Sequence, residues 1–205
     1  MIRVAGAATM VGMISLRTFR PPALGFLGPW VAWSLAGLTL GILAVTVIMI
    51  AAAAAISGSE ESDLLFAVVL GAGIGGGLGL AQQRVLRRHL PGAPWAPATI
   101  VGLLAGTLMV FVVVGDDKHG IGEALEAVLH ALAVGTAMGL AQRHALLGHA
   151  AAARWPLTAI AVWLSAEALG RGLIAATGSE ELGLTALFLS AQVLTGAALA
   201  RVLKT

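Results

Sequence analysis

Six long apolar segments joined by connections of alternating charge are the feature that most constrains this chain. Each segment is long enough, at roughly 20 residues, to cross a bilayer core of about 30 Å as a helix. The apolar runs are continuous and show no period of two, which favours helices over strands. The expected helices are 30–56, 64–83, 95–115, 123–147, 155–177 and 183–203. The sequence therefore predicts an all-α, polytopic transmembrane bundle.

Composition agrees with this class and excludes others. Of the 205 residues, 59% are hydrophobic and only 11% are charged, whereas a soluble domain carries about 25% charged residues. The net charge is only +2, and the basic residues are dispersed over short loops, so no nucleic-acid partner is expected. There is no cysteine, so thiolate metal sites and thiol nucleophiles are excluded. The expected surroundings are a lipid bilayer.

The charges of the connections predict the orientation. Ten of the twelve Lys and Arg residues fall in the terminal segments and alternate connections that lie on one side: Arg3, Arg17, Arg20, Arg84, Arg87, Arg88, Arg143, Arg154, Arg201 and Lys204. The connections on the other side hold acidic residues and one lysine, Lys118. Basic loops face the cytoplasm, so both termini are expected there. Tryptophans at the starts of the odd-numbered helices, Trp30, Trp33, Trp95 and Trp155, are expected at the headgroup level.

The first 29 residues form a separate segment in this interpretation, and residues 30–205 form one domain. Val4 to Leu16 is apolar and lies between Arg3 and Arg17. A retained interfacial helix on the cytoplasmic face is favoured, with a signal peptide and a seventh span as alternatives. The Pro21-Pro22 pair would end that helix before the membrane.

Internal repetition predicts three tandem helical hairpins at about 30–94, 95–154 and 155–205. Gly79-Leu80-Ala81-Gln82 recurs as Gly139-Leu140-Ala141-Gln142, sixty residues later, and Trp95 recurs as Trp155 at the same offset. Each copy contains two spans and so keeps its orientation, as in a parallel repeat.

These motifs resemble those of a group of multi-pass bacterial membrane proteins built from repeated segments. The shared pattern is a glycine-rich helix end with a glutamine, a basic turn (here Leu86-Arg87-Arg88) and a tryptophan that opens the next helix (Trp95). The resemblance implies an architecture only, and it implies no activity. With the charges of the connections also taken into account, the expected location is a bacterial plasma membrane with both termini cytoplasmic.

Small residues spaced four apart recur in the helices, and close backbone approach between helices is what such spacing permits in lipid. Packing within one bundle is the favoured interpretation. The alternative is a contact with a second copy or with a membrane partner through Gly71, Gly75 and Gly79.

Ionisable residues inside spans are functional candidates by default, because they are costly in lipid. Glu126 and His130 are spaced i, i+4 on the fourth segment, and Glu167 and Arg171 are spaced i, i+4 on the fifth. With Gln192 on the sixth segment, they predict an outward-opening polar pocket among helices four to six. Two ligands at Glu126 and His130 do not make a metal site, and no cofactor or catalytic residue is predicted.

The leading functional hypothesis is a small transport or permeation protein for an ion or small polar solute. A non-catalytic accessory or assembly subunit of a membrane complex is the alternative, because the chain is small and lacks a soluble domain or a nucleotide motif. A membrane-embedded enzyme is the third hypothesis. Neither a nucleophile beside a base nor an acid–base pair suggests a particular reaction.

Overall fold

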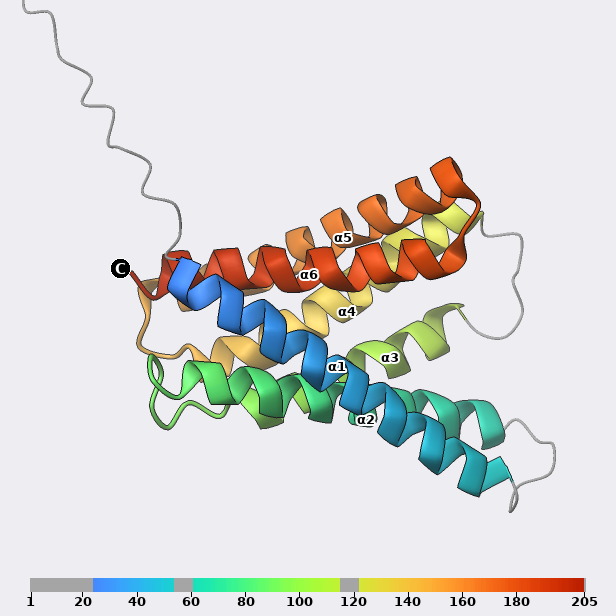
Figure 1. The fold of residues 1–205 in the computed structure, drawn as a ribbon, viewed down its shortest axis with the longest axis horizontal. Helices are drawn as coiled ribbons and strands as arrows, with labels where there is room; N and C mark the ends of the chain where they lie inside the picture. The colour runs from blue at the N-terminus through green and yellow to red at the C-terminus, as the bar shows by residue number, and fades with distance from the viewer. Residues whose placement is uncertain (1–23, 54–60, 115–121, 205) are drawn as a thin grey trace, which may run out of the picture.

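The computed structural model describes residues 24–53, 61–114 and 122–204, in which all regular structure is helical (Figure 1). The elements are α1 (Leu24–Ala53), α2 (Glu61–Leu86), α3 (Trp95–Val114), α4 (Glu123–Ala145), the short 3₁₀ helix η1 (Ala150–Arg154), α5 (Trp155–Thr177) and α6 (Glu180–Val202). All six α-helices are long and apolar enough to cross a membrane. The fold is thus compatible with an integral, multi-pass membrane protein. The proposed N-terminal interfacial helix lies outside the described residues.

The helix bounds agree closely with those expected from the apolar runs. α5 has the predicted bounds, and most other helix ends differ by up to about three residues. Such differences are within the usual uncertainty of helix ends. The exception is the start of α1, which lies at Leu24 rather than at Trp30 and so places Pro29 inside the helix. Near a helix start a proline removes only one backbone hydrogen bond, so the helix extends past it.

The helices form a ring in which each α-helix packs against the next one in sequence, and α1 packs against α6 to close it. The closing contact between α1 and α6 is the smallest of the contacts around the ring. In Figure 1 the two helices lie together near the C-terminus, and α1 and α2 diverge from α5 and α6 toward the other end. The bundle is therefore most compact at the end that holds the C-terminus.

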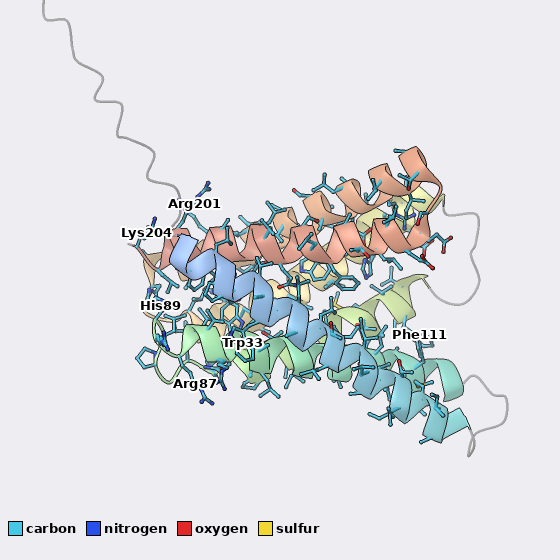
Figure 2. All side chains as sticks on the ribbon, in the orientation of Figure 1. Trp33, Arg87, His89, Phe111, Arg201 and Lys204 are labelled. Carbon is cyan, nitrogen blue, oxygen red and sulfur yellow. The ribbon has the colours of Figure 1, made fainter. Side chains whose placement is uncertain are left out.

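That compact end also carries most of the described basic residues and is called the basic end below. Figure 2 shows Arg87, His89, Arg201 and Lys204 gathered there, while Phe111 lies near the opposite end. Glu180 and Glu181 begin α6 at the opposite end. The segregation of charge expected from the sequence is present among the described residues. The side of the membrane that the basic end faces stays a prediction.

Backbone-to-backbone packing holds neighbouring helices together. A Cβ atom added to Gly77 of α2 would lie 2.1 Å from the carbonyl oxygen of Gly37 on α1, so no side chain fits at this crossing. The glycines considered as a partner surface in the sequence analysis also allow two helices to pack closely. Added Cβ atoms at Gly71, Gly75 and Gly79 would lie 2.8–3.0 Å from backbone atoms of α3. These three glycines pack within the chain and are not free to contact a partner in the folded bundle.

Candidate functional site

Three buried tryptophans form a layer near the basic end. The indole N–H of Trp95 donates to Gln82 Oε1 at 2.9 Å, and that of Trp155 donates to Gln142 Oε1 at 3.1 Å. Each of these hydrogen bonds links residues thirteen apart in the sequence, and the second lies sixty residues after the first. Trp30 differs, because its N–H donates to the backbone oxygen of Gln192 on α6 at 2.9 Å. In this way α1 is joined to α6 across the closing contact of the ring.

The position of these tryptophans corrects the sequence-based expectation. Trp30, Trp95 and Trp155 are almost completely buried, and their rings stack edge-to-face in a row, with centroids 6.2 and 6.0 Å apart. The three indoles therefore do not face lipid headgroups as expected, because each indole N–H has a partner inside the bundle. Trp33 is the exception, since 42% of it is exposed.

The glutamines of this layer also bond to one another. Gln82 Nε2 donates to Gln192 Oε1 at 2.9 Å and lies 3.3 Å from Ser34 Oγ. Gln142 Nε2 donates to Thr99 Oγ1 at 3.2 Å. The layer thus joins residues of α1, α2, α3, α4, α5 and α6 through neutral hydrogen bonds, and all three glutamines are buried.

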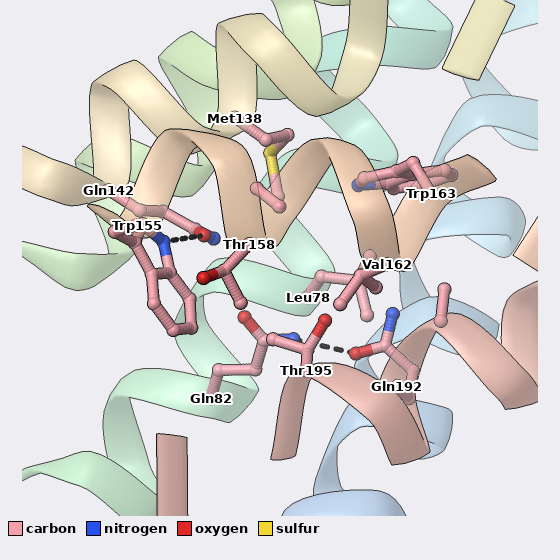
Figure 3. Close-up of a pocket in the computed structure, with 12 residues that line it drawn as sticks. Leu78, Gln82, Met138, Gln142, Trp155, Thr158, Val162, Trp163, Gln192 and Thr195 are labelled. Carbon is pink, nitrogen blue, oxygen red and sulfur yellow. Dashed lines mark hydrogen bonds between the residues drawn. The ribbon is translucent and has the colours of Figure 1, made fainter. Parts of the chain in front are cut away.

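A small cavity adjoins this layer, and the side chains of Gln82 and Gln192 face it (Figure 3). Its volume is about 20 Å³, which is room for about one water molecule. Gln142, Trp155 and Trp163 also line it, together with two threonines, Thr158 and Thr195. Of these residues only Gln192 was predicted from the sequence to line a pocket.

An ionisable cluster lies on α4 and α5, closer to the end opposite the basic end. Glu167 of α5 is buried, with 9% of its side chain exposed, and its Oε1 forms a short contact with Nδ1 of His130 on α4. Its Oε2 lies 3.8 Å from Nε of Arg171, one turn further along α5. The carboxylate of Glu167 is therefore flanked by a nitrogen-bearing group on each side, and its contact with His130 crosses between helices.

The cluster is only partly paired and partly exposed. The side chains of His130 and Arg171 are 37% and 39% exposed. The Nε of Arg171 is buried but makes no hydrogen bond within the described residues. A carboxylate flanked by an imidazole and a guanidinium can hold a proton or a small ion. Because the guanidinium is already present, the imidazole can be neutral while the cluster remains balanced in charge.

The five residues predicted to share one pocket do not do so. His130, Glu167 and Arg171 come together as expected. Glu126 lies one turn before His130 on α4, and its side chain makes no ion pair within the described part of the chain. Gln192 belongs to the glutamine layer instead. The predicted pocket is therefore two sites, an ionisable one and a neutral one.

Trp163 of α5 connects the two sites. Its ring meets that of His130 edge-to-face at a centroid distance of 6.3 Å, and it also lines the small cavity. A chain of contacts thus runs from the ionisable cluster through Trp163 and the cavity to the tryptophan layer. Within the described residues no three His, Asp or Glu side chains are grouped to hold a metal ion.

Comparison of the chain with protein-family models, with curated proteins and with solved structures finds no match. The resemblance to repeated bacterial membrane proteins accordingly stays a prediction, and function has to be argued from the two sites.

Proposed function

We propose that the protein is a small transport or permeation protein in which Glu167 and His130 bind the transported proton or small ion. The observation that supports this is the contact between Glu167 and His130, which joins two membrane-crossing helices through ionisable groups. Ionisable side chains at this depth are costly in lipid and mark ion pathways and proton relays in membrane proteins.

The need to balance the charge of Glu167 does not by itself explain why His130 is part of the cluster. Arg171 on the same helix supplies the opposite charge, so His130 is not needed to balance the carboxylate. Apolar residues at all three positions would also avoid the cost of placing charge in lipid. An imidazole on a second helix adds a second group that can bind a proton or a small ion.

The proposed route continues from the cluster toward the basic end. It passes Trp163 and the cavity lined by Gln82 and Gln192, where there is room for about one water molecule. Beyond the cavity lie the buried tryptophans. Movement of α1 against α6, the smallest helix contact of the ring, would open this layer with the least loss of packing.

We propose in addition that the helices form three tandem hairpins and that the basic end lies in the cytoplasm. Three tandem hairpins, with the basic end in the cytoplasm of a bacterial cell, would place the ionisable cluster in the outer half of the plasma membrane. The two equivalent tryptophan–glutamine hydrogen bonds support the repeat, and the clustering of Arg87, Arg201 and Lys204 supports the orientation.

The test is ion flux into liposomes that contain the purified full-length chain. A pH-sensitive dye inside the liposomes would report proton entry driven by an imposed membrane potential, and ion-sensitive dyes would report alkali cations. We expect flux above that of empty liposomes, and a loss of at least tenfold for Glu167→Gln. Glu181→Gln is the matched control, because Glu181 is exposed at the start of α6.

Two results would contradict the proposal. One is wild-type protein with no flux of any tested ion, and the other is full flux for Glu167→Gln. Either result, together with specific co-purification of a membrane protein, would favour the accessory-subunit alternative. Thermal unfolding of both variants in detergent verifies that a lost flux does not reflect a lost fold.

A further inference from the structure

A groove runs along the outer surface of the bundle between α1 and α2. Its volume is about 520 Å³, within the usual range of ligand sites. Leu40 and Leu80 line it and are 65% and 67% exposed, so the groove faces away from the interior of the bundle. In a membrane this face meets lipid.

Glycines, which have no side chain, create the groove. The close crossing of Gly37 and Gly77 brings the two helices together, and Gly73 and Gly76 leave the surface beside that crossing hollow. A Cβ atom added to Gly76 would have no atom within 4 Å. A side chain at Gly76 would therefore enter the groove without disturbing the contact between α1 and α2.

The length of the groove distinguishes between its candidate occupants. It follows α1 from Trp33 to Ala44, about 16 Å at the rise of an α-helix. This is about half of the 30 Å hydrocarbon core. A partner helix can contact the bundle over any part of its length, whereas the acyl chain of a lipid spans one leaflet and so matches the length of the groove. The groove begins near the basic end, so the leaflet is the one on that side.

A positively charged side chain, that of Arg84, lies at one end of the groove. The guanidinium of Arg84 lies 4.8 Å from the ring centroid of Trp33, which fixes its position by a cation–π contact. No carboxylate within the described residues pairs with it. Arg87 and Arg88 follow in the next turn and are exposed. This end of the groove is therefore complementary in charge to an anionic phosphate group.

We propose that this groove binds one anionic phospholipid of the leaflet at the basic end, with an acyl chain along the glycines and the headgroup phosphate on Arg84. The ring of Trp33 holds the guanidinium in place, and Leu40 and Leu80 border the chain. The proposal does not depend on transport, because neither the groove nor Arg84 belongs to the ionisable cluster or the glutamine layer.

Native mass spectrometry of the full-length chain, released from nanodiscs of defined lipids, tests the proposal. Phosphatidylglycerol and phosphatidylcholine with the same acyl chains are compared. We expect wild-type protein to retain phosphatidylglycerol at least fivefold more than phosphatidylcholine. Arg84→Gln should reduce that preference to about onefold, and Gly76→Leu should reduce retention of both lipids. Gly172→Leu is the matched control, since a Cβ at this exposed glycine of α5 also meets no atom within 4 Å.

Equal retention of the two lipids by wild-type protein would overturn the proposal, as would unchanged retention by Gly76→Leu. A second copy in the groove would also overturn it. The chain has no cysteine, so Leu80→Cys gives a single reporter there. Efficient disulfide formation between two such chains in membranes would show an interface between copies, and its absence agrees with a bound lipid.

Discussion

The two polar regions of the bundle differ in how completely their groups are paired. In the glutamine layer near the basic end, the oxygens of Gln82 and Gln142 accept from indoles and their amide nitrogens donate to further side chains. In the cluster of His130, Glu167 and Arg171, a buried guanidinium nitrogen makes no hydrogen bond to any residue that the structure describes, and two of the side chains are partly exposed. The first arrangement is that of a structural network, and the second retains capacity for a ligand.

This difference matters because buried polar groups in membrane proteins can serve either purpose. A buried polar group that is fully satisfied stabilises one packing of the helices, whereas a partly satisfied one costs free energy unless it has a further use. If the comparison is right, substitutions in the glutamine layer lower stability most. Substitutions in the cluster should alter flux with little loss of stability.

The largest loss of stability is expected for Gln82→Leu. Leucine would leave the Trp95 N–H and Gln192 Oε1 without their partners and remove the contact to Ser34. At about 1–3 kcal/mol for each unsatisfied buried group, the free energy of unfolding should fall by about 3 kcal/mol. Unfolding in mixed micelles, followed by circular dichroism, measures it. The double variant with Trp95→Phe should lose less than the sum of the two single losses, and strict additivity would contradict the network.

A smaller loss is expected for Gln142→Leu. This glutamine has one indole donor and one hydroxyl acceptor, Trp155 and Thr99, and it does not bond to another glutamine. The free energy of unfolding should fall by about 1.5 kcal/mol, measured in the same micelles. A loss equal to that of Gln82→Leu would mean that the bond between Gln82 and Gln192 adds nothing to stability.

The fold and the two sites were predictable from the sequence to different degrees. Long apolar runs fix membrane helices strongly, so α5 has the predicted bounds, and the spacing of Glu167 and Arg171 on one helix places them together. The contact of His130 with Glu167 depends on the packing of α4 against α5, which spacing within one segment does not reveal. Gln192 of α6 was predicted to share a pocket with the cluster, but its side chain bonds to Gln82 instead.

The tryptophans show why a general preference failed here. Indoles at helix starts usually lie at the interface, but Trp95 and Trp155 each follow a glutamine by thirteen residues. This spacing, repeated at an offset of sixty, was the available signal that the indole N–H has a partner within the chain. The spacing is informative only because the basic turn folds the end of one helix back onto the start of the next.

A still smaller change of stability is expected for Arg171→Met, which keeps the length of the side chain and removes its charge. The contact of Arg171 with Glu167 is long at 3.8 Å and the side chain is partly exposed, so the free energy of unfolding should fall by about 1 kcal/mol or less. Flux in liposomes should fall at least tenfold. A loss of stability matching that of Gln82→Leu, with unchanged flux per folded protein, would assign the cluster to structure instead.

The smallest effect on stability and flux is expected for Glu126→Gln. This variant tests whether the ion-binding cluster extends to Glu126. Glu126 lies on α4 one turn from His130, but its side chain makes no ion pair with the described residues. Glutamine has nearly the same shape, so the free energy of unfolding should change by less than about 0.5 kcal/mol. Flux should stay within about twofold of wild type. A tenfold loss of flux would instead extend the ion-binding group along α4 to Glu126, and the carboxylate would then face the ion path rather than the lipid-water boundary.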